Sequence, residues 1–222
     1  EDYRARRARR LARRHDLAVP HAAILALEGV LWGAFGTTGQ RCTATSRLIL
    51  QSGVHDDFLS RLAKRARALT LGDGRREGTD VGPLVNEDAL KKVERYVDIG
   101  VADGADLLMG GRRATGKGLE KGYFFEPTIF ARVEPGMRIE QEEIFGPVLS
   151  VIRVETPDEA FRINNGVKYG LSSSLYTRDV SVAFRALNEL DNGITYINAP
   201  TIGAEAHLPF GGVKQTGNGH RE

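Results

Sequence analysis

Short apolar runs alternate with amphipathic stretches along most of this 222-residue chain. The runs are rich in β-branched and aliphatic residues, as strands are, and the stretches between them repeat apolar residues every three or four positions, as helices do. Strands separated by helices pair mainly in parallel, so the pattern predicts an α/β fold: a mainly parallel twisted sheet with flanking helices. The expected strands are Ser46–Gln51, Asp106–Met109, Tyr123–Phe130, Val148–Val154, Leu171–Tyr176 and Ile194–Asn198.

Local signals place the helices between these strands. An apolar run from Leu25 to Phe35 favours a helix, and Asp57–Leu69 carries apolar residues on one face and basic residues on the other. Asn86 is a suitable N-cap for the next helix, because its side chain can accept a hydrogen bond from a free backbone N–H. Thr156 has the same role before Pro157, and Glu159 completes the spacing of a capping box. A further helix is expected over Asp179–Leu190.

The composition is ordinary for a globular protein, with 41% hydrophobic and 27% charged residues. A single cysteine excludes an intramolecular disulfide framework and suits a reducing compartment. No apolar run approaches the roughly 20 residues that a membrane span needs, and no signal segment opens the chain. These features predict a cytoplasmic protein without a membrane partner.

Positive charge is concentrated at the start of the chain. Residues 1–20 hold seven arginines against three acids, a net charge of +4, whereas the whole chain carries +2. Such a run can be a nucleic-acid-binding arm, but aromatic residues are not interleaved beyond Tyr3, and a solvated tail is favoured. We therefore expect residues 1–24 to form a disordered, Arg-rich head and expect no nucleic-acid partner.

The only cysteine, Cys42, stands in a glycine-containing turn between an apolar helical run and a strand. Such a turn can hold a thiol partly exposed, with backbone N–H groups pointing toward it, which suits a thiolate nucleophile. A lone cysteine can equally be a small buried hydrophobe. The turn by itself leaves both interpretations open.

Two other stretches contain residues that core packing does not require. Glu142–Pro147 places two acids and Phe145 at the entry to a buried strand, where they could also be a simple turn before that strand. Asn198–Gly203 and Leu208–Gly219 are rich in glycine, which indicates close approach to other backbone or to a ligand. The chain has neither of the glycine-rich phosphate-binding fingerprints, so it shows no complete nucleotide-binding unit of its own.

In their order and spacing, these stretches resemble the aldehyde dehydrogenase superfamily from about residue 25 to the end of the chain. The resemblance rests on five landmarks, namely Gly39–Arg47, Tyr123–Thr128, Glu142–Pro147, Asn164–Leu171 and Pro209–Lys214 with Gly217–Glu222. It implies that residues 25–222 form the catalytic domain, with Cys42 attacking the aldehyde carbonyl and passing through a thiohemiacetal and a thioester. It further implies that Glu143 and Phe145 contact NAD or NADP.

The same resemblance assigns the remaining site residues. Phe210 is expected to line the aldehyde pocket, and Thr201, Ile202 and Gly203 to begin the loop that contacts the far end of the substrate. No metal is expected. By analogy alone, the polar character of Thr201–His207 favours a semialdehyde that bears a carboxylate or an amine. The choice between NAD and NADP and a variant that transfers the acyl group to coenzyme A stay open.

The chain also departs from the family pattern. The family's general-base glutamate precedes the cysteine by thirty-odd residues, which falls in Ala5–Arg14, where there is no acid. Most of the cofactor domain and the terminal strand of the homo-oligomeric family members are likewise not found. One explanation is that residues 1–24 come from a frameshift or a mis-assigned start. We expect little dehydrogenase turnover from the isolated chain, and a non-catalytic interaction or structural module is the alternative.

Overall fold

The structure is a computed structural model that describes residues 21–116, 118–203 and 207–217. The first described element is helix α2 (His21–Phe35), so residues 21–24, which we had grouped with the Arg-rich head, belong to a helix. The expectations for residues 1–20 and for the tip of the loop at 204–206 lie outside the described residues. None of the described helices is long and apolar enough to cross a membrane.

The main sheet has four strands in the order β1-β4-β3-β2. These strands are β1 (Arg47–Gln51), β4 (Val148–Val154), β3 (Thr128–Ala131) and β2 (Asp106–Met109). The pairings of β4 with β1 and with β3 are parallel, and β2 pairs with β3 in the antiparallel direction. Parallel strands need cover on both faces, and β4 is accordingly buried at every position except Arg153. The predicted α/β fold with a mainly parallel sheet is confirmed.

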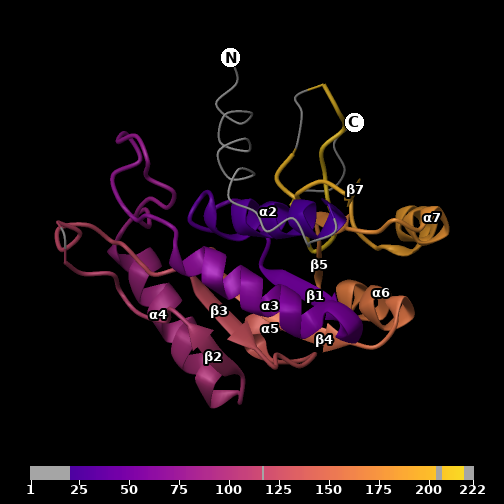
Figure 1. The fold of residues 1–222 in the computed structure, drawn as a ribbon, viewed down its shortest axis with the longest axis horizontal. Coiled ribbons are helices and arrows are strands. Elements are labelled where there is room, and N and C mark those ends of the chain that lie inside the picture. Colours follow the sequence, from indigo (N-terminus) through magenta and orange to yellow (C-terminus); the bar gives the residue numbers. More distant parts are fainter. Residues whose placement is uncertain (1–20, 117, 204–206, 218–222) are drawn as a thin grey trace.

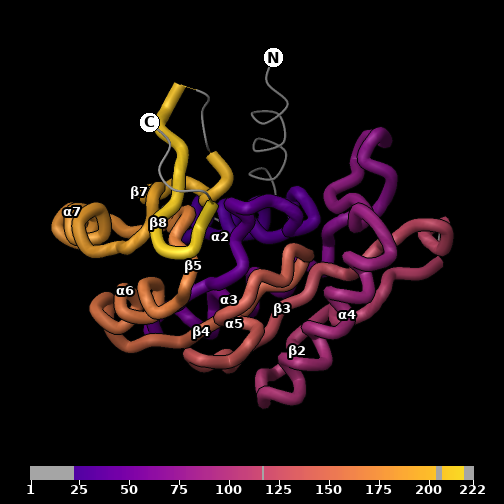
Figure 2. Tube along the Cα trace, turned by 180° about the vertical axis from the view of Figure 1, so that it is seen from behind, coloured from indigo at the N-terminus to yellow at the C-terminus, as the bar shows by residue number. Residues whose placement is uncertain are grey.

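Helices cover both faces of this sheet, as Figures 1 and 2 show from opposite sides. Helices α2 and α3 (Ser52–Arg67) pack on one face, where the side chains of Ile129, Leu149 and Val151 point. The other face carries α4 (Glu87–Ala102), α5 (Arg138–Gln141) and α6 (Pro157–Asn165). Successive strand residues point to opposite faces, so Phe130, Val148 and Ile152 join this second core.

Two small sheets lie beside the main one. The strands β6 (Ser172–Leu175) and β7 (Ile194–Ile197) pair in parallel, with α7 (Val180–Glu189) between them in the chain. The strand β5 (Tyr169–Gly170) pairs in the antiparallel direction with β8 (Val213–Lys214). This pairing brings the end of the described chain back to the segment that follows α6 (Figure 2).

The helix caps agree with the sequence, although some boundaries move. Asn86 accepts a hydrogen bond from the backbone N–H of Ala89, and Thr156 accepts one from Glu159, at 2.9 and 3.2 Å. The Glu159 carboxylate, however, accepts from the N–H of Glu155 instead of that of Thr156. The capping box is therefore shifted by one residue.

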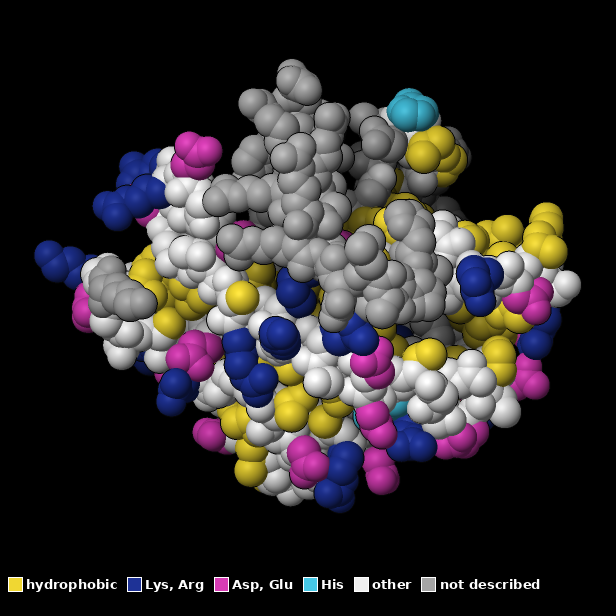
Figure 3. All heavy atoms as spheres, viewed as in Figure 1, with side chains coloured by type: hydrophobic (Ala, Val, Ile, Leu, Met, Phe, Trp, Pro, Cys, Tyr) yellow, Lys and Arg dark blue, Asp and Glu magenta, His cyan; other side chains and the backbone are white. Residues whose placement is uncertain are grey.

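Besides α2, the elements that differ clearly from their predicted bounds are α3 and β3. Helix α3 begins at Ser52, five residues before the predicted start. The strand predicted at Tyr123–Phe130 forms only as Thr128–Ala131, because the preceding residues pair with Arg112–Ala114 and Pro127 has no N–H to donate. The outer face of α3 carries lysine and arginine side chains with acids interspersed, as predicted for an amphipathic helix (Figure 3).

Candidate active site

The cysteine turn connects the end of α2 to the start of β1. The backbone N–H of Ala44 donates to the carbonyl of Arg41 at 3.0 Å, and this turn places Cys42 at its first corner. The N–H of Thr45 donates to the Gly33 carbonyl at 3.1 Å, which ties the far end of the turn to α2. The Cys42 side chain is exposed, in agreement with a surface thiol and not with a core residue.

Thr201 supports this turn from behind. Its hydroxyl donates to the Thr43 carbonyl at 2.7 Å and lies 3.0 Å from the hydroxyl of Thr45. Thr201 and Ile202 are 9% and 5% exposed, and Gly203 is half-buried. Of the three residues predicted to begin the substrate loop, Thr201 is thus engaged in holding the cysteine turn.

The second loop, Glu142–Pro147, contacts the cysteine turn directly. Gly39 has φ +66°, and a Cβ added there would overlap the carbonyl oxygen of Gly146. Phe145 also has a positive φ, +60°, which is strained for a residue with a large side chain. Phe145 is 40% exposed, and Glu143 is exposed as well. Both predicted cofactor-contacting residues therefore lie outside the core.

A cleft of about 320 Å³ opens beside Cys42. Its lining includes Arg41 and Cys42 from the turn together with Glu143 and Phe145 from the second loop. The rest of the lining comes from Gly39 and from residues within 44–47, 140–148, 164–173, 191–192 and 215–217. Phe210, which is half-buried, lies outside this lining. Cys42 and the two predicted cofactor contacts thus share one cleft, whereas the predicted substrate contacts do not line it.

Glu142, the first acid of the second loop, is held by partners that the sequence did not reveal. Its carboxylate accepts two hydrogen bonds from Arg138, at 2.9 and 3.0 Å, and one from the Tyr96 hydroxyl at 2.6 Å. The Arg138 bonds, followed by the Tyr96 bond, lower the pKa of Glu142 to about 2. Desolvation first, and then the bond to Glu142, raise the pKa of Tyr96. Glu142 therefore anchors the loop to α4 while Glu143 stays exposed.

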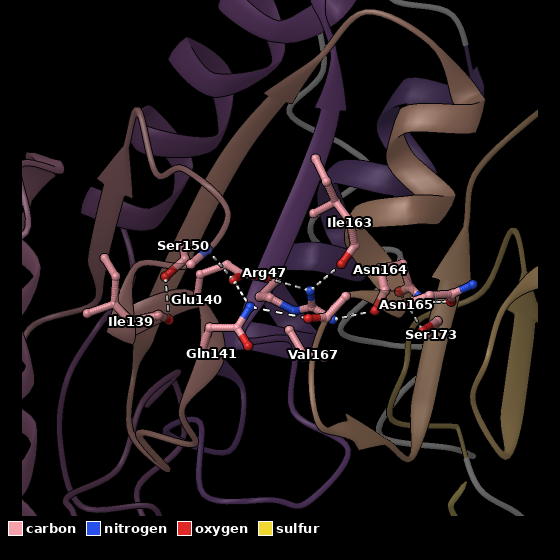
Figure 4. Close-up of polar contacts among 12 residues, drawn as sticks. Arg47, Ile139, Glu140, Gln141, Ser150, Ile163, Asn164, Asn165, Val167 and Ser173 are labelled. Atoms are coloured by element: carbon pink, nitrogen blue, oxygen red, sulfur yellow. Dashed lines mark hydrogen bonds and ion pairs between the residues drawn. The ribbon is translucent and has the colours of Figure 1, made fainter. Parts of the chain in front are cut away.

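Arg47, one of the residues that line the cleft, joins three elements (Figure 4). Its guanidinium lies 2.9 Å from the carboxylate of Glu140 and donates to the carbonyls of Ile163 and Asn164 at 3.1 Å each. The Asn164 side chain in turn accepts from the hydroxyl of Ser173 on β6 at 2.8 Å. Sequence reasoning missed this network, because Arg47 looks like an ordinary strand-entry residue and Glu140 is one acid in an acidic run.

Lys214 also forms hydrogen bonds at the C-terminal end of α6. Its ammonium donates to the carbonyls of Asn165 and Val167 at 2.8 and 3.2 Å, and it lies 3.1 Å from the carboxylate of Asp191. The backbone of Lys214 has φ +58°, which the β5–β8 pairing and these bonds maintain. Within the described ranges, no three His, Cys, Asp or Glu side chains are grouped closely enough to hold a metal ion.

The contact between the two loops predicts that Gly39→Ala is destabilising. The added methyl meets the Gly146 carbonyl, and a positive φ is unfavourable for alanine, so the free energy of unfolding should fall by about 1–3 kcal/mol. Urea denaturation measures this change. Gly53→Ala in α3, where nothing lies within 4 Å of the added Cβ, is the matched control and should be neutral or slightly stabilising. Equal stability of both variants would show that the loops do not touch.

The lowered pKa of Glu142 predicts a pH-dependent contribution to stability. A carboxylate whose pKa is lower in the folded state stabilises the fold above its ordinary value of 4.5, and this stabilisation is lost as the pH falls towards 2. Glu142→Gln should therefore be less stable than the parent chain at pH 7, and the difference should shrink between pH 4.5 and 2. Urea denaturation across this range tests it, with Glu94→Gln, an exposed acid on α4, as control. A pH-independent difference would contradict the carboxylate's role.

Comparison with known proteins places the whole described chain in one family. The model of the aldehyde dehydrogenase family matches residues 22–222. The α-ketoglutaric semialdehyde dehydrogenase of Bacillus subtilis is 42% identical over 197 residues, which are 89% of this chain and 40% of that protein. The α-ketoglutarate semialdehyde dehydrogenase of Haloferax volcanii is 46% identical over 184 residues, 83% of this chain and 38% of that protein.

Solved structures agree in fold. A betaine aldehyde dehydrogenase of Staphylococcus aureus superposes with a TM-score of 0.85 at 37% identity, covering 87% of this chain and 38% of that one. The 1-pyrroline-5-carboxylate dehydrogenase of Thermus thermophilus superposes with a TM-score of 0.81 at 42% identity, covering 87% and 36%. The chain spans about two fifths of the length of these relatives. With a family match over nearly its whole length, the chain belongs to the aldehyde dehydrogenase family.

Proposed function

We propose that Cys42 is the nucleophile for NAD(P)-dependent oxidation of an aldehyde to a carboxylic acid. One observation carries this proposal: the exposed thiol opens into the cleft that Glu143 and Phe145 also line. A structural cysteine would be buried among apolar side chains, whereas a nucleophile must be reachable by its substrate. Membership of the aldehyde dehydrogenase family supports the reaction class.

In the proposed reaction, the Cys42 thiolate attacks the carbonyl carbon and forms a carbon–sulfur bond. The negative charge that develops on the carbonyl oxygen is stabilised by the backbone N–H of Cys42, the kind of donor that supplies an oxyanion hole. The nicotinamide cofactor, when bound, supplies the hydride acceptor. Cys42 then holds the acyl group as a thioester, which water hydrolyses to release the acid and the thiol.

The residues beside the cysteine fit such a cofactor. Glu143 presents an exposed carboxylate that can accept hydrogen bonds from ribose hydroxyls, and the Phe145 ring offers a flat apolar surface at the same end of the cleft. The positive φ of Phe145 keeps this ring out of the core. A further structure of the Staphylococcus aureus betaine aldehyde dehydrogenase contains NAD+, which supports NAD or NADP as the cofactor here.

We propose an aldehyde that bears a carboxylate as the substrate class. Two of the relatives are semialdehyde dehydrogenases for ketoglutaric semialdehyde, and Arg41, which lines the cleft next to Cys42, is exposed. A guanidinium at that position can pair with a carboxylate on the substrate. Phe210 and the loop that starts at Thr201, Ile202 and Gly203 remain the proposed contacts for the rest of the substrate, with Thr201 also holding the cysteine turn.

Turnover by the isolated 222-residue polypeptide should be slow. A general base typically contributes about 10²–10⁴-fold to such a hydrolysis, and Ala5–Arg14, where the family pattern expects it, contains no acid. We propose that the polypeptide captures aldehydes at Cys42 but releases acid far more slowly than complete family members do.

Reaction with an enone tests whether Cys42 is a nucleophile. The carbonyl of an enone mimics an aldehyde, and its β-carbon forms a covalent bond with a thiolate. Mass spectrometry should show one adduct at Cys42 that forms faster in the folded chain than in urea and is slowed by added aldehyde. A carboxylate-bearing aldehyde should protect better than a neutral one of equal length, and Arg41→Gln should remove this preference. Absorbance at 340 nm with NAD(P) should stay near the baseline, and Cys42→Ser is the control that gives no adduct.

Opposite outcomes separate the alternatives. Enone capture that is no faster in the folded chain, with no protection by aldehydes, would contradict the nucleophile and favour a non-catalytic interaction or structural module. Reduced nicotinamide accumulating at a rate typical of the family would contradict the expected slow turnover, while leaving the nucleophile in place.

A further inference from the structure

Arg47 and Glu140 form an ion pair that is almost sealed from solvent. The side chain of Glu140 is 1% exposed and that of Arg47 is 16% exposed, with 2.9 Å between Nη1 and Oε1. Burial lowers the pKa of Arg47, and the charge of Glu140 opposes this effect. A buried pair of this kind gains little net stability, since desolvation offsets most of the attraction, and two apolar residues often serve as well. We therefore look for the role of the pair in how it positions the segments that it joins.

Both side chains of the pair also form hydrogen bonds with other groups of the protein. The guanidinium of Arg47 also donates to the carbonyls of Ile163 and Asn164, the last turn of α6, where unpaired carbonyls need donors. The second oxygen of Glu140 accepts from the backbone N–H of Gly136 and from the Gln141 amide. Arginine's planar fork suits these simultaneous bonds, so neither side chain can shift alone.

The positions of the pair in the chain connect it to the site. Arg47 follows Cys42 by five residues, and Glu140 precedes Glu143 by three. Figure 4 shows the Arg47 side chain between Glu140 on one side and the end of α6 on the other. Arg47, Glu140 and Asn164 all line the cleft that contains Cys42. The ion pair thus joins β1, which follows the Cys42 turn, to α5, which precedes the Glu142–Pro147 loop, and both partners belong to the lining of the cleft.

We propose that the Arg47–Glu140 pair is a positioning device that sets the separation between the Cys42 turn and the Glu143–Phe145 loop. The role assigned to these loops rests on the proposed function, but the coupling of their positions does not. Neither Arg47 nor Glu140 needs to touch a substrate. Loosening the pair should let the two loops move independently while the rest of the fold stays intact.

Spin labels at Cys42 and at Glu143→Cys report this separation directly, because Cys42 is the only natural cysteine. The distance distribution between the labels, measured by pulsed electron paramagnetic resonance, should be narrow in the parent. Arg47→Lys, which keeps the charge but loses the fork, should broaden it at least twofold. The paired variant Arg47→Met with Glu140→Leu leaves no unpaired buried charge and should broaden it as much.

A matched control removes an exposed ion pair of equal length. Glu87 and Lys91 on α4 also lie 2.9 Å apart but are 60% and 64% exposed, so Glu87→Gln with Lys91→Gln should leave the distribution unchanged. Enone capture at Cys42, measured without the second label, should slow at least threefold in Arg47→Lys at temperatures where circular dichroism shows a folded chain. A merely structural role would leave both readouts unchanged below the unfolding transition.

An unchanged narrow distribution in folded Arg47→Lys, or in the folded paired variant, would overturn the proposal. The distance measurement uses neither aldehyde nor cofactor, so its outcome is independent of whether Cys42 oxidises aldehydes. Slow enone capture in the parent chain together with broadening in the variants would contradict the proposed function and leave the positioning role standing.

Discussion

The C-terminus of α6 is the point on which the rest of the site depends. A helix end leaves carbonyls without partners, and here two cations from distant segments supply the donors. Arg47 approaches from the strand that follows the cysteine turn, and Lys214 approaches from the C-terminal strand β8. Both side chains bind the same short stretch of backbone at the end of α6. They therefore hold the cysteine turn and strand β8 in one frame, and Glu140 connects the Glu142–Pro147 loop to this frame through Arg47.

Backbone strain is present around this frame. Phe145 and Lys214 have positive φ, and both lie in or beside the segments that line the cleft. For residues with side chains such conformations are costly and persist where surrounding contacts over-determine them. Gly39 also has a positive φ, which glycine adopts without this cost. The overlap that a side chain at Gly39 would make with the Gly146 carbonyl, and the bonds of Lys214 to α6, are contacts of this kind. The rigidity of the cleft therefore comes from backbone approach as much as from side-chain packing.

The sequence predicted the elements well where local signals decide them. The caps at Asn86 and Thr156 and the buried strand Val148–Val154 follow from side-chain chemistry that acts within a few residues. The turn around Cys42 left the exposure of its thiol open, and the family motifs predicted a nucleophile at Cys42 and a cofactor contact at Glu143 without predicting the cleft that both residues line. The Arg47–Glu140 pair could not be predicted, because its partners are 93 positions apart in the chain and meet only when β1 pairs with β4 in the folded sheet. The engagement of Thr201 with the cysteine turn was missed for the same reason.

Three distant stretches of the chain line one cleft with Cys42, and amide chemical shifts report on this arrangement. Alkylating Cys42 with iodoacetamide should shift amide resonances in residues 143–146, 164–173 and 215–217, since residues in all three segments line the cleft. Resonances of Asp106–Met109, on the far edge of the main sheet, should stay in place. Changes confined to residues 39–46 would contradict a shared cleft.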